Sequence, residues 1–209
     1  MNNVILLGGG GHCRSVIDVI ESTDLIVKGI LDVRGKIGQV VRGYPIIGVI
    51  EEIQKFISPN DKYFITVGQI DNGGTRNRLY DMVTALELEL TTIIDPSAYL
   101  SNHATLGKGS IIMKRSVINA NAKIGLNSII NTGAIIEHDV NIGDHCHIST
   151  ASILNGGVSI GNNCFIGSGA VIAQNVKIVN NVIIGASSLV LKSISVPGIY
   201  VGCPAKKIK

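Results

Sequence analysis

The chain has 209 residues, of which 45% are apolar, 16% charged and 4% aromatic, and it contains no tryptophan. This length suffices for two small domains. A formal net charge of +3 is too small to indicate a nucleic-acid partner. No apolar run is long enough for a membrane span or a signal peptide, so we expect a cytoplasmic protein without a membrane partner.

The four cysteines form no CxxC pair and have no histidine at zinc-ligand spacing. Cys146 and Cys164 lie 18 residues apart. We interpret all four as reduced thiols that serve as small core residues. They are Cys13, Cys146, Cys164 and Cys203.

The first 90 residues alternate between short apolar runs and amphipathic segments, and the first run is followed by a glycine-rich turn. This strand–helix–strand pattern predicts a Rossmann-like α/β domain over residues 1–90. The predicted strands are Val4–Leu7, Leu25–Leu31 and Tyr63–Val67; one predicted helix runs from Arg14 to about Ser22, and another carries Leu79, Met82, Val83 and Leu86.

The glycine-rich turn, Gly8–His12, is compatible with phosphate binding, because backbone N–H groups and a helix N-terminus attract anions. Asp32 lies 24 residues after Gly8, where a carboxylate accepts hydrogen bonds from a ribose or a base. The dinucleotide fingerprint is broken, because Cys13 stands where the third glycine belongs. A nucleotide other than a nicotinamide dinucleotide is favoured, and a purely structural turn is the alternative.

Three further polar residues of this domain have two interpretations each. His12 is either a phosphate donor or an ordinary residue at a helix N-terminus. Arg76 and Arg78 open the second helix, beyond the loop 68–74, and a solvated charged face is the favoured interpretation.

From Ile94 to Val190 an aliphatic residue falls at every sixth position, and a small or β-branched residue follows four positions later. A period of six fits neither an α-helix nor an ordinary strand. It predicts a triangular prism in which six residues form a short strand and a corner, and three such units close a coil of 18 residues. Residues 91–209 are therefore expected to form a parallel β-helix whose interior is sealed by aliphatic side chains.

Chemistry in such a domain belongs on its outer corners, where Glu137-His138-Asp139 stands out. His138 is the second residue after an interior isoleucine, and a carboxylate beside an imidazole suits a general base. Solvated corner residues are the alternative interpretation. A metal site formed with His145 and His147 is disfavoured, because the spacing does not bring the three rings onto one coil face.

His147 follows His138 by nine residues, half of an 18-residue coil. We expect their two corners to lie on opposite sides of one prism, so that they cooperate only between neighbouring prisms. This favours a cyclic oligomer, and a triangular prism suits a trimer. After Val190 the repeat decays, and Lys206 in the basic turn Val201–Lys207 either meets the phosphates of an acyl-carrier cofactor or belongs to a solvated tail.

Several motifs together resemble one family: GGGGH before a helix, Asp32 after the second strand, INTGAIIEHD (Ile130–Asp139), IGDHCHI (Ile142–Ile148) and VGCPAKKI (Val201–Ile208). They are similar to the acetyl-CoA-dependent nucleotide-sugar N-acetyltransferases and the related sialic acid O-acetyltransferase-type proteins. The resemblance covers nearly the whole chain. It implies that the β-helix is left-handed and that the protein is a homotrimer. It also implies that acetyl-CoA binds between subunits and that no metal takes part.

The resemblance also assigns residues to roles. His138 resembles the catalytic base, and Asp139 stands where an acidic residue tunes it. The expected acetyl-CoA-binding residues are His147, Gly156, Ser168, Gly185, Ala186 and Lys206. The expected nucleotide-sugar-binding residues are Gly10, Gly11, His12, Asp32, Gly68 and Asn131. The chain departs from the family in its longer loop from Gly68 to Arg76 and in Val33, where some relatives have a second acidic residue.

The implied reaction is direct acetyl transfer. His138 would remove a proton from the sugar amine as it attacks the thioester, and a backbone or His147 donor would stabilise the oxyanion. The expected substrate is a UDP- or dTDP-linked 4-amino-4,6-dideoxy sugar used for bacterial surface glycans. The alternatives are an O-acetyltransferase of a sialic-acid-like sugar and a non-catalytic trimeric scaffold.

Overall fold

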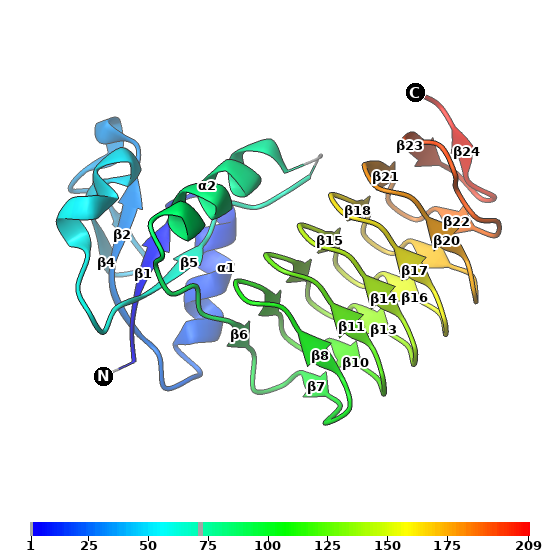
Figure 1. The fold of residues 1–209 in the computed structure, drawn as a ribbon, viewed down its shortest axis with the longest axis horizontal. Coiled ribbons are helices and arrows are strands. Elements are labelled where there is room, and N and C mark those ends of the chain that lie inside the picture. The colour runs from blue at the N-terminus through cyan, green and yellow to red at the C-terminus, as the bar shows by residue number, and fades with distance from the viewer. Residues whose placement is uncertain (1, 71–72) are drawn as a thin grey trace. The chain divides into compact units, whose positions relative to one another are not determined.

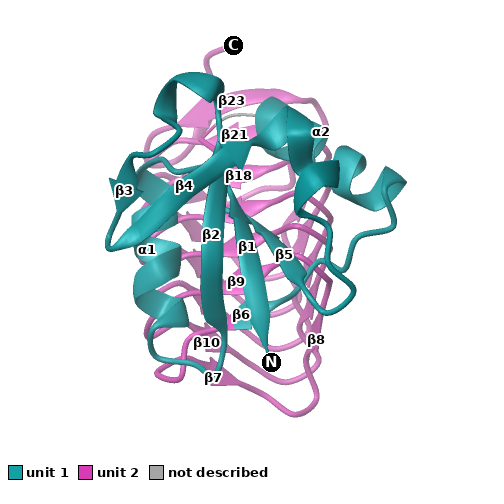
Figure 2. Ribbon diagram, turned by 90° about the vertical axis from the view of Figure 1, so that its left-hand side faces the viewer, with its two compact units in different colours: residues 1–68, 74–93 teal, residues 69–73, 94–209 magenta. Residues whose placement is uncertain are grey.

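The computed structural model describes residues 2–70 and 73–209, so Asp71 and Asn72 of the longer loop lie outside the described residues. The chain forms two compact units, which Figure 2 distinguishes by colour. Unit 1 contains the residues up to Gly68 together with Gly74–Ile93, and unit 2 contains Gln69–Gly73 and Ile94–Lys209.

Unit 1 is built on a five-stranded sheet with the order β3-β4-β2-β1-β5. All neighbours are parallel except β3, which forms an antiparallel hairpin with β4. The chain leaves β1 toward β2 on one side and returns to β5 on the other, so the loop after β1 lies at the switch point where α/β sheets bind ligands. The strands are β1 (Asn3–Leu7), β2 (Ile26–Asp32), β3 (Val40–Val41), β4 (Tyr44–Val49) and β5 (Lys62–Ile65); the helices are α1 (Gly11–Ile20), η1 (Arg34–Lys36), η2 (Ile50–Phe56) and α2 (Gly74–Ala85).

The structure confirms the predicted Rossmann-like pattern and adds elements to it. Helix α1 begins at Gly11, three residues before the predicted start, so His12 and Cys13 lie in its first turn. The hairpin of β3 and β4 was not predicted. Its tight turn has positive φ at Arg42 (47°) and Gly43 (88°), the combination that matches the twist of a two-residue hairpin.

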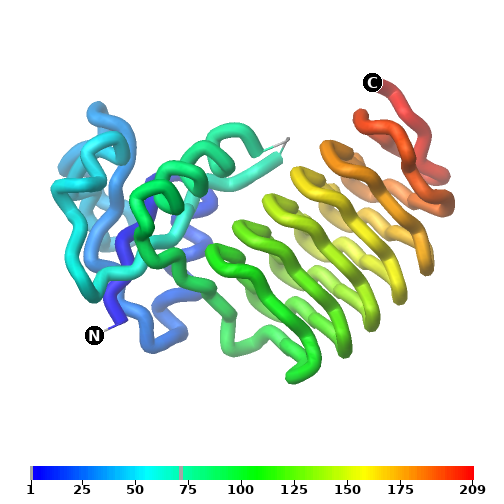
Figure 3. The backbone as a smooth tube through the Cα atoms, viewed as in Figure 1, coloured from blue at the N-terminus to red at the C-terminus, as the bar shows by residue number. Residues whose placement is uncertain are grey.

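Unit 2 is a parallel β-helix with three faces, seen as stacked rungs in Figure 1 and as a continuous coil in Figure 3. From β7 to β22, successive strands on each face pair 18 residues apart, as in Val117 with Ile135, which confirms the predicted coil length. The first face contains β6 (Ile93–Ile94), β9 (Ile111–Ile112), β12 (Ile129–Ile130), β15 (His147–Ile148), β18 (Phe165–Ile166), β21 (Val182–Ile184), β23 (Gly198–Val201) and β24 (Lys206–Lys207). The second contains β7 (Tyr99–Leu100), β10 (Val117–Ile118), β13 (Ile135–Ile136), β16 (Ile153–Leu154), β19 (Val171–Ile172) and β22 (Leu189–Val190); the third contains β8 (Thr105–Leu106), β11 (Lys123–Ile124), β14 (Asn141–Ile142), β17 (Ser159–Ile160) and β20 (Lys177–Ile178).

The chain turns from the first to the second face at the first corner, from the second to the third at the second corner, and back at the third corner. Every sixth residue from Gly109 to Ser187 has a positive φ, and glycine or asparagine occupies most of these positions. These two residue types tolerate the left-handed region best, which is why they recur at the corners. The repeat in the sequence is therefore also a repeat of backbone conformation.

A ladder of side-chain hydrogen bonds joins successive coils at the third corner. Asp144 accepts from the backbone N–H of Leu126 at 2.8 Å, Asn162 from that of Asp144 at 2.9 Å, and Asn180 from that of Asn162 at 2.8 Å. A Cβ atom on Gly143 would lie 2.2 Å from the Asn162 side-chain oxygen, so this ladder requires a glycine there. Such bonds satisfy corner N–H groups that no strand pairs.

The interior is apolar as predicted, and the sixth-position aliphatic residues from Ile112 to Val190 are buried. Cys13, Cys146 and Cys164 are buried core residues, but Cys203 is exposed in the C-terminal turn, so its prediction as a core residue was wrong. Among the residues that the structure describes, no helix has the length and apolar character needed to cross a membrane.

Candidate active site

His138 and Asp139 lie at the second corner, between β13 and β14, as predicted. The Nδ1 atom of His138 is 2.8 Å from Oδ2 of Asp139, and both side chains are more than half exposed (59% and 57%). Asp139 has a φ of 62°, the left-handed turn conformation that brings its carboxylate to the same side as the preceding residue. Because a carboxylate accepts, Nδ1 carries the proton and Nε2 keeps its lone pair, as a general base requires.

A third residue, Asn121, completes this corner. Its Nδ2 donates to Oδ1 of Asp139 at 3.2 Å, and it lies 18 residues earlier, on the preceding coil. The hydrogen bond from His138, followed by the one from Asn121, holds the pKa of Asp139 below its ordinary value, so the carboxylate is ionised at neutral pH. The sequence analysis missed Asn121, although its one-coil spacing from Asp139 was a usable signal.

Gly156 lies one coil beyond His138 and is buried beneath its imidazole ring. A Cβ atom built on Gly156 would come within 2.7 Å of Nε2 of His138. The structure therefore brings Gly156, expected from the resemblance near acetyl-CoA, into direct contact with the proposed base.

His147 lies in β15 on the first face, so its predicted corner position was wrong. The residue that precedes an interior aliphatic residue belongs to the short strand, and its side chain leaves the face rather than the corner. His147 is only 6% exposed. Its Nδ1 is hydrogen-bonded to the backbone carbonyl of Gln69, its Nε2 is 3.1 Å from Nδ2 of Asn131, and its ring centroid lies 5.2 Å from that of Phe165 in a T-shaped arrangement.

These contacts fix the hydrogen-bonding roles of His147. The Gln69 carbonyl only accepts, so Nδ1 of His147 donates. The Oδ1 atom of Asn131 accepts from the N–H of Thr132 at 2.8 Å, which leaves its Nδ2 to donate to Nε2 of His147. Nε2 is thus an acceptor, which argues against the expected role of His147 as an oxyanion donor. The side chain of Gln69 also donates to the carbonyl of His145 at 2.9 Å, a contact that sequence reasoning missed.

The remaining acetyl-CoA candidates lie elsewhere on the prism. Ser168 and Ala186 are exposed at the first corner, one coil apart, with Gly185 beside them, and Ser168 shares a hydroxyl contact of 2.9 Å with Ser149. Lys206 lines a hollow of about 360 Å³ at the C-terminal end of the β-helix. The first corner and the second corner flank the second face, so one chain does not bring these residues onto one corner with His138.

In unit 1, Asp32 lines a hollow of about 540 Å³ together with Gly8, Val33 and Arg78. Its carboxylate accepts from the N–H of Gly9 at 2.7 Å and from the side chain of Lys36 at 2.9 Å, while the N–H of Val33 donates to it at 2.7 Å. Burial opposes ionisation of Asp32, but these hydrogen bonds outweigh it and lower its pKa. Asp32 thus anchors the glycine loop to the end of β2.

The glycine loop leaves an open approach to helix α1. Gly10 is the N-cap and no side chain caps the helix, and an added Cβ on either Gly10 or Gly11 would meet nothing within 4 Å. The start of α1 is therefore open to an anion, which is compatible with the phosphate site predicted at this loop. His12 follows in the first turn, and its side chain lies beside Gly68, where an added Cβ would be 3.4 Å away.

Arg76 corrects the interpretation of a solvated charged face. Its side chain is fully buried in unit 1 and donates to the backbone carbonyls of Ile65 at 2.7 Å and Val67 at 2.8 Å. It also lies over the ring of Phe64, with 5.9 Å to the centroid. Burial lowers its pKa to about 9, which leaves the guanidinium charged at neutral pH. Arg76 therefore supports the end of β5, whereas Arg78 is exposed.

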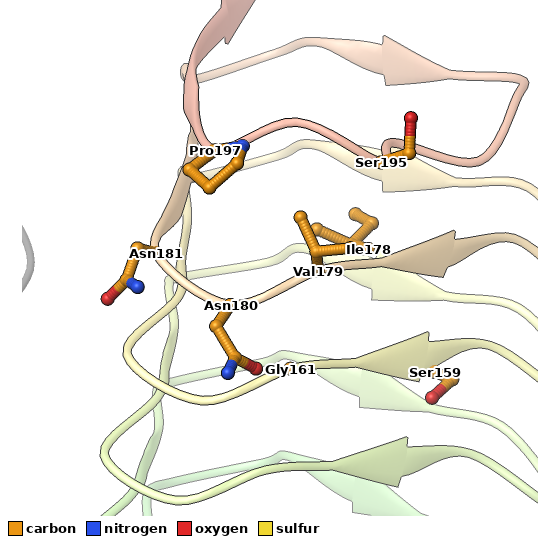
Figure 4. Close-up of a pocket in the computed structure, with 8 residues that line it drawn as sticks. All are labelled: Ser159, Gly161, Ile178, Val179, Asn180, Asn181, Ser195 and Pro197. Atoms are coloured by element: carbon orange, nitrogen blue, oxygen red, sulfur yellow. The ribbon is translucent and has the colours of Figure 1, made fainter.

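Another hollow, of about 490 Å³, lies at the C-terminal end of the third corner (Figure 4). Its lining includes Ser159, Asn180, Asn181 and Pro197, and none of the described residues that line it has a side chain that titrates. It therefore offers hydrogen bonds but no acid or base. Within the part of the chain that the structure describes, no group of three or more His, Cys, Asp or Glu side chains is arranged to hold a metal ion.

Comparisons with known proteins agree with this architecture. Residues 3–83 match the PglD N-terminal domain, and residues 157–192 match the bacterial transferase hexapeptide (six repeats). PerB from Caulobacter crescentus, solved in complex with CoA and GDP-perosamine, is 31% identical with a TM-score of 0.90, over 100% of this chain and 98% of that chain. The acetyltransferase domain of PglB from Neisseria gonorrhoeae FA1090 is 28% identical with a TM-score of 0.91, over 100% of both chains.

A curated relative, the UDP-N-acetylbacillosamine N-acetyltransferase of Bacillus subtilis (strain 168), is 33% identical over 118 residues, which is 54% of this chain. The match spans about half of that relative's length (52%). The predicted fold, a Rossmann-like domain followed by a left-handed β-helix of hexapeptide repeats, is confirmed. With PerB matched over nearly its entire length, the chain belongs to the hexapeptide-repeat acyltransferases with a PglD-type N-terminal domain, the family of the nucleotide-sugar N-acetyltransferases.

Proposed function

We propose that this protein transfers the acetyl group of acetyl-CoA to the amino group of a nucleotide-linked sugar. The observation that carries this proposal is the exposed His138–Asp139 pair, whose 2.8 Å contact leaves Nε2 of His138 available as a base. The ligands of two relatives support the same chemistry: PerB was solved with CoA and GDP-perosamine, and the Neisseria domain with acetyl coenzyme A.

The reaction requires one proton transfer and one acyl transfer. Nε2 of His138 accepts a proton from the sugar amine while the nitrogen attacks the carbonyl carbon of the thioester. The tetrahedral intermediate collapses with cleavage of the C–S bond, and the imidazolium returns its proton to the departing thiolate. Asp139 holds the Nδ1 proton throughout and stabilises the imidazolium. A backbone N–H at the neighbouring coils is the candidate oxyanion donor.

The proposed sugar is a 4-amino-4,6-dideoxy sugar linked to UDP or dTDP and destined for a bacterial surface glycan. The glycine loop supports a diphosphate ligand, because the uncapped N-terminus of α1 and the open space beside Gly10 and Gly11 suit an anion. The hollow beside Asp32 and Val33 is the candidate place for the nucleoside.

The proposed assembly is a homotrimer, and the outer surface of the second face supports it. The outward strand positions on this face are all apolar: Tyr99, Val117, Ile135, Ile153, Val171 and Leu189. The corresponding positions on the third face are polar: Thr105, Lys123, Asn141, Ser159 and Lys177. An apolar stripe of this length needs a partner. Packing the second faces of three copies together would set the first corner of one prism near the second corner of the next.

A substrate panel tests the proposal. Release of free CoA is measured with acetyl-CoA and UDP-, dTDP- or GDP-linked amino sugars, with the corresponding hydroxyl sugars alongside. We expect turnover only with amino sugars. Turnover confined to hydroxyl sugars would replace N-acetylation by O-acetylation. No turnover with any sugar, from a trimer that binds no acetyl-CoA, would support the scaffold instead.

A further inference from the structure

We propose that Asn121 and Gly156, on the coils before and after His138, are positioning residues that fix the direction in which Nε2 of His138 points. This inference rests on the proposed role of His138 as the base. Three successive coils meet at the second corner, and each contributes one part: Asn121 holds Asp139, Asp139 holds His138, and Gly156 leaves the space that the imidazole occupies.

Asn121 acts on the carboxylate. Asp139 is exposed, and a free carboxylate at the surface rotates between several orientations. Here its two oxygens have separate partners, because Oδ1 accepts from Asn121 at 3.2 Å while Oδ2 faces Nδ1 of His138 at 2.8 Å. Asn121 and Asp139 have nearly the same φ, 60° and 62°, so they occupy equivalent positions on stacked coils. Holding one oxygen therefore directs the other toward the imidazole.

Gly156 acts on the ring itself. A Cβ on Gly156 would lie 2.7 Å from Nε2 and 2.8 Å from Cε1 of His138, closer than van der Waals contact allows. The backbone does not require a glycine, because the φ of Gly156 lies outside the left-handed region. The residues at the equivalent turn position of all the other six-residue units, from Lys108 to Ala186, have a side chain. Ala120 and Ala186 show that a Cβ fits the turn. The glycine therefore serves the imidazole rather than the fold.

Several other charged or titratable groups lie near His138 and Asp139 and also influence the pH dependence of activity. Glu137 precedes His138, and its Oε2 accepts from Asn119 at 3.0 Å. His103 and Lys123 line a hollow of about 360 Å³ beside Asp139, together with Asn121 and Asn141. Glu137, His103, Lys123 and Asp139 all stay unchanged in the variants below.

The test uses the full-length protein and three variants: Asn121→Gly, Asn121→Asp and Gly156→Ala. Glycine and aspartate both tolerate the left-handed φ of Asn121, so the backbone is preserved. Gly156→Ala should displace Nε2 and lower kcat by about 10- to 100-fold, the order expected when a reacting atom moves by about an ångström. The KM for acetyl-CoA should stay near wild type, which separates positioning from a binding role of Gly156.

The two Asn121 variants should move the pH profile in opposite directions. Asn121→Gly frees Asp139 from its orientation, so kcat falls about tenfold and the acidic limb of the kcat profile moves to lower pH, because a carboxylate that is no longer held against Nδ1 stabilises the imidazolium less. Asn121→Asp adds a second carboxylate beside the imidazolium, so the acidic limb moves to higher pH. A residue that served only the fold would not give shifts of opposite sign.

Two variants serve as controls. Asn181→Gly removes the side chain from the same left-handed position (φ 61°) at a different corner, and Gly35→Ala adds a Cβ where nothing lies within 4 Å. Both should keep wild-type kinetics. The inference is overturned if Asn121→Gly and Gly156→Ala retain the wild-type kcat and pH profile while His138→Ala loses activity. If His138→Ala itself turns over at the wild-type rate, the proposed base fails, and that result is distinct from the first.

Discussion

Two histidines of unit 2 have contrasting surroundings: His138 lies at an exposed corner, and His147 lies in a buried hydrogen-bond network. At the corner, one ring nitrogen is held by Asp139, and the other lies beside Gly156 in a side chain that is 59% exposed. On the first face, both ring nitrogens of His147 are engaged, one by the carbonyl of Gln69 and one by Asn131. The two imidazoles of unit 2 therefore differ in exposure and in partners: His138 is held by the adjacent Asp139, whereas His147 is held by a loop residue 78 positions away and by Asn131.

The largest expected effect is at the exposed corner. His138→Ala should lower kcat by about 10²- to 10⁴-fold, the usual contribution of a general base. The thermal midpoint should stay close to wild type, because the side chain is exposed. Steady-state CoA release and differential scanning fluorimetry measure the two quantities. Wild-type turnover in this variant would remove His138 from the mechanism.

The next prediction concerns the separation of the two corners by the second face. Ile153→Glu places a charge in the apolar stripe and should convert the proposed trimer into monomers with little residual activity, because charged groups at an interface core are strongly unfavourable. Light scattering gives the mass and the CoA assay gives the activity. Ser159→Glu, at the matching outward position of the polar third face, is the control and should remain trimeric and active. Full activity from a monomeric Ile153→Glu protein would place the entire site within one chain.

A smaller effect is expected from the partner of His138. Asp139→Asn keeps the size and the tolerance of the left-handed φ but removes the charge. We expect kcat to fall about 10- to 100-fold and the acidic limb of its pH profile to move to lower pH, because the imidazolium loses its carboxylate. An unchanged pH profile would show that the carboxylate does not act through the ring.

Removing His147 from the buried network should lower the stability of the protein rather than shift the pH profile of its activity. His147→Leu leaves the Gln69 carbonyl and the Asn131 amide without the ring, and unfolding should become easier by about 1–3 kcal/mol, the cost of unsatisfied buried polar groups. Urea unfolding measures this change. In the wild-type protein, ¹⁵N chemical shifts of the ring should report Nδ1 as the protonated nitrogen. A protonated Nε2 instead would contradict the hydrogen-bond assignment.

The last prediction concerns a destabilisation of similar size in unit 1, where Asp32 is a buried carboxylate that accepts from Gly9, Lys36 and Val33. Asp32→Asn should destabilise the protein by about 1–3 kcal/mol at pH 7, because hydrogen bonds to a charged acceptor are lost. The folded pKa of Asp32 is lowered, so its contribution is present above the unfolded value of about 3.9 and disappears as the pH falls through the folded pKa. The difference between wild type and variant in urea unfolding should therefore be constant from pH 7 to 5 and shrink below pH 4. A difference that persists at low pH would rule out the carboxylate charge as its source.

The period of six in the sequence predicts which repeat residues point outward at a corner and which point into the interior. That period places His138 at an outward corner and Cys146 inside, and both positions are confirmed. It failed for His147, because residues next to an interior position belong to a strand of only two residues. Asn121 was within reach of the sequence, since a residue 18 positions from Asp139 must stack on it.

Gln69, Asp32 and Arg76 show where sequence reasoning ends. Gln69 meets His145 and His147 across 76 and 78 residues, and no periodicity links a loop to a coil that distant. Asp32 had the expected place after a strand, but its oxygens accept from the chain itself. Arg76 looked like a surface residue, and only the packing of α2 on β5 shows that it is buried.

The sequence by itself determined the prism, its 18-residue coil and the side of the chain on which each repeat residue lies, because a strict repeat has one way to bury its aliphatic positions. The tertiary structure decided which outward side chains become neighbours. Stacking puts Asn121 on Asp139 and His138 over Gly156, and these contacts between coils set the direction of the one imidazole nitrogen that the proposed chemistry needs.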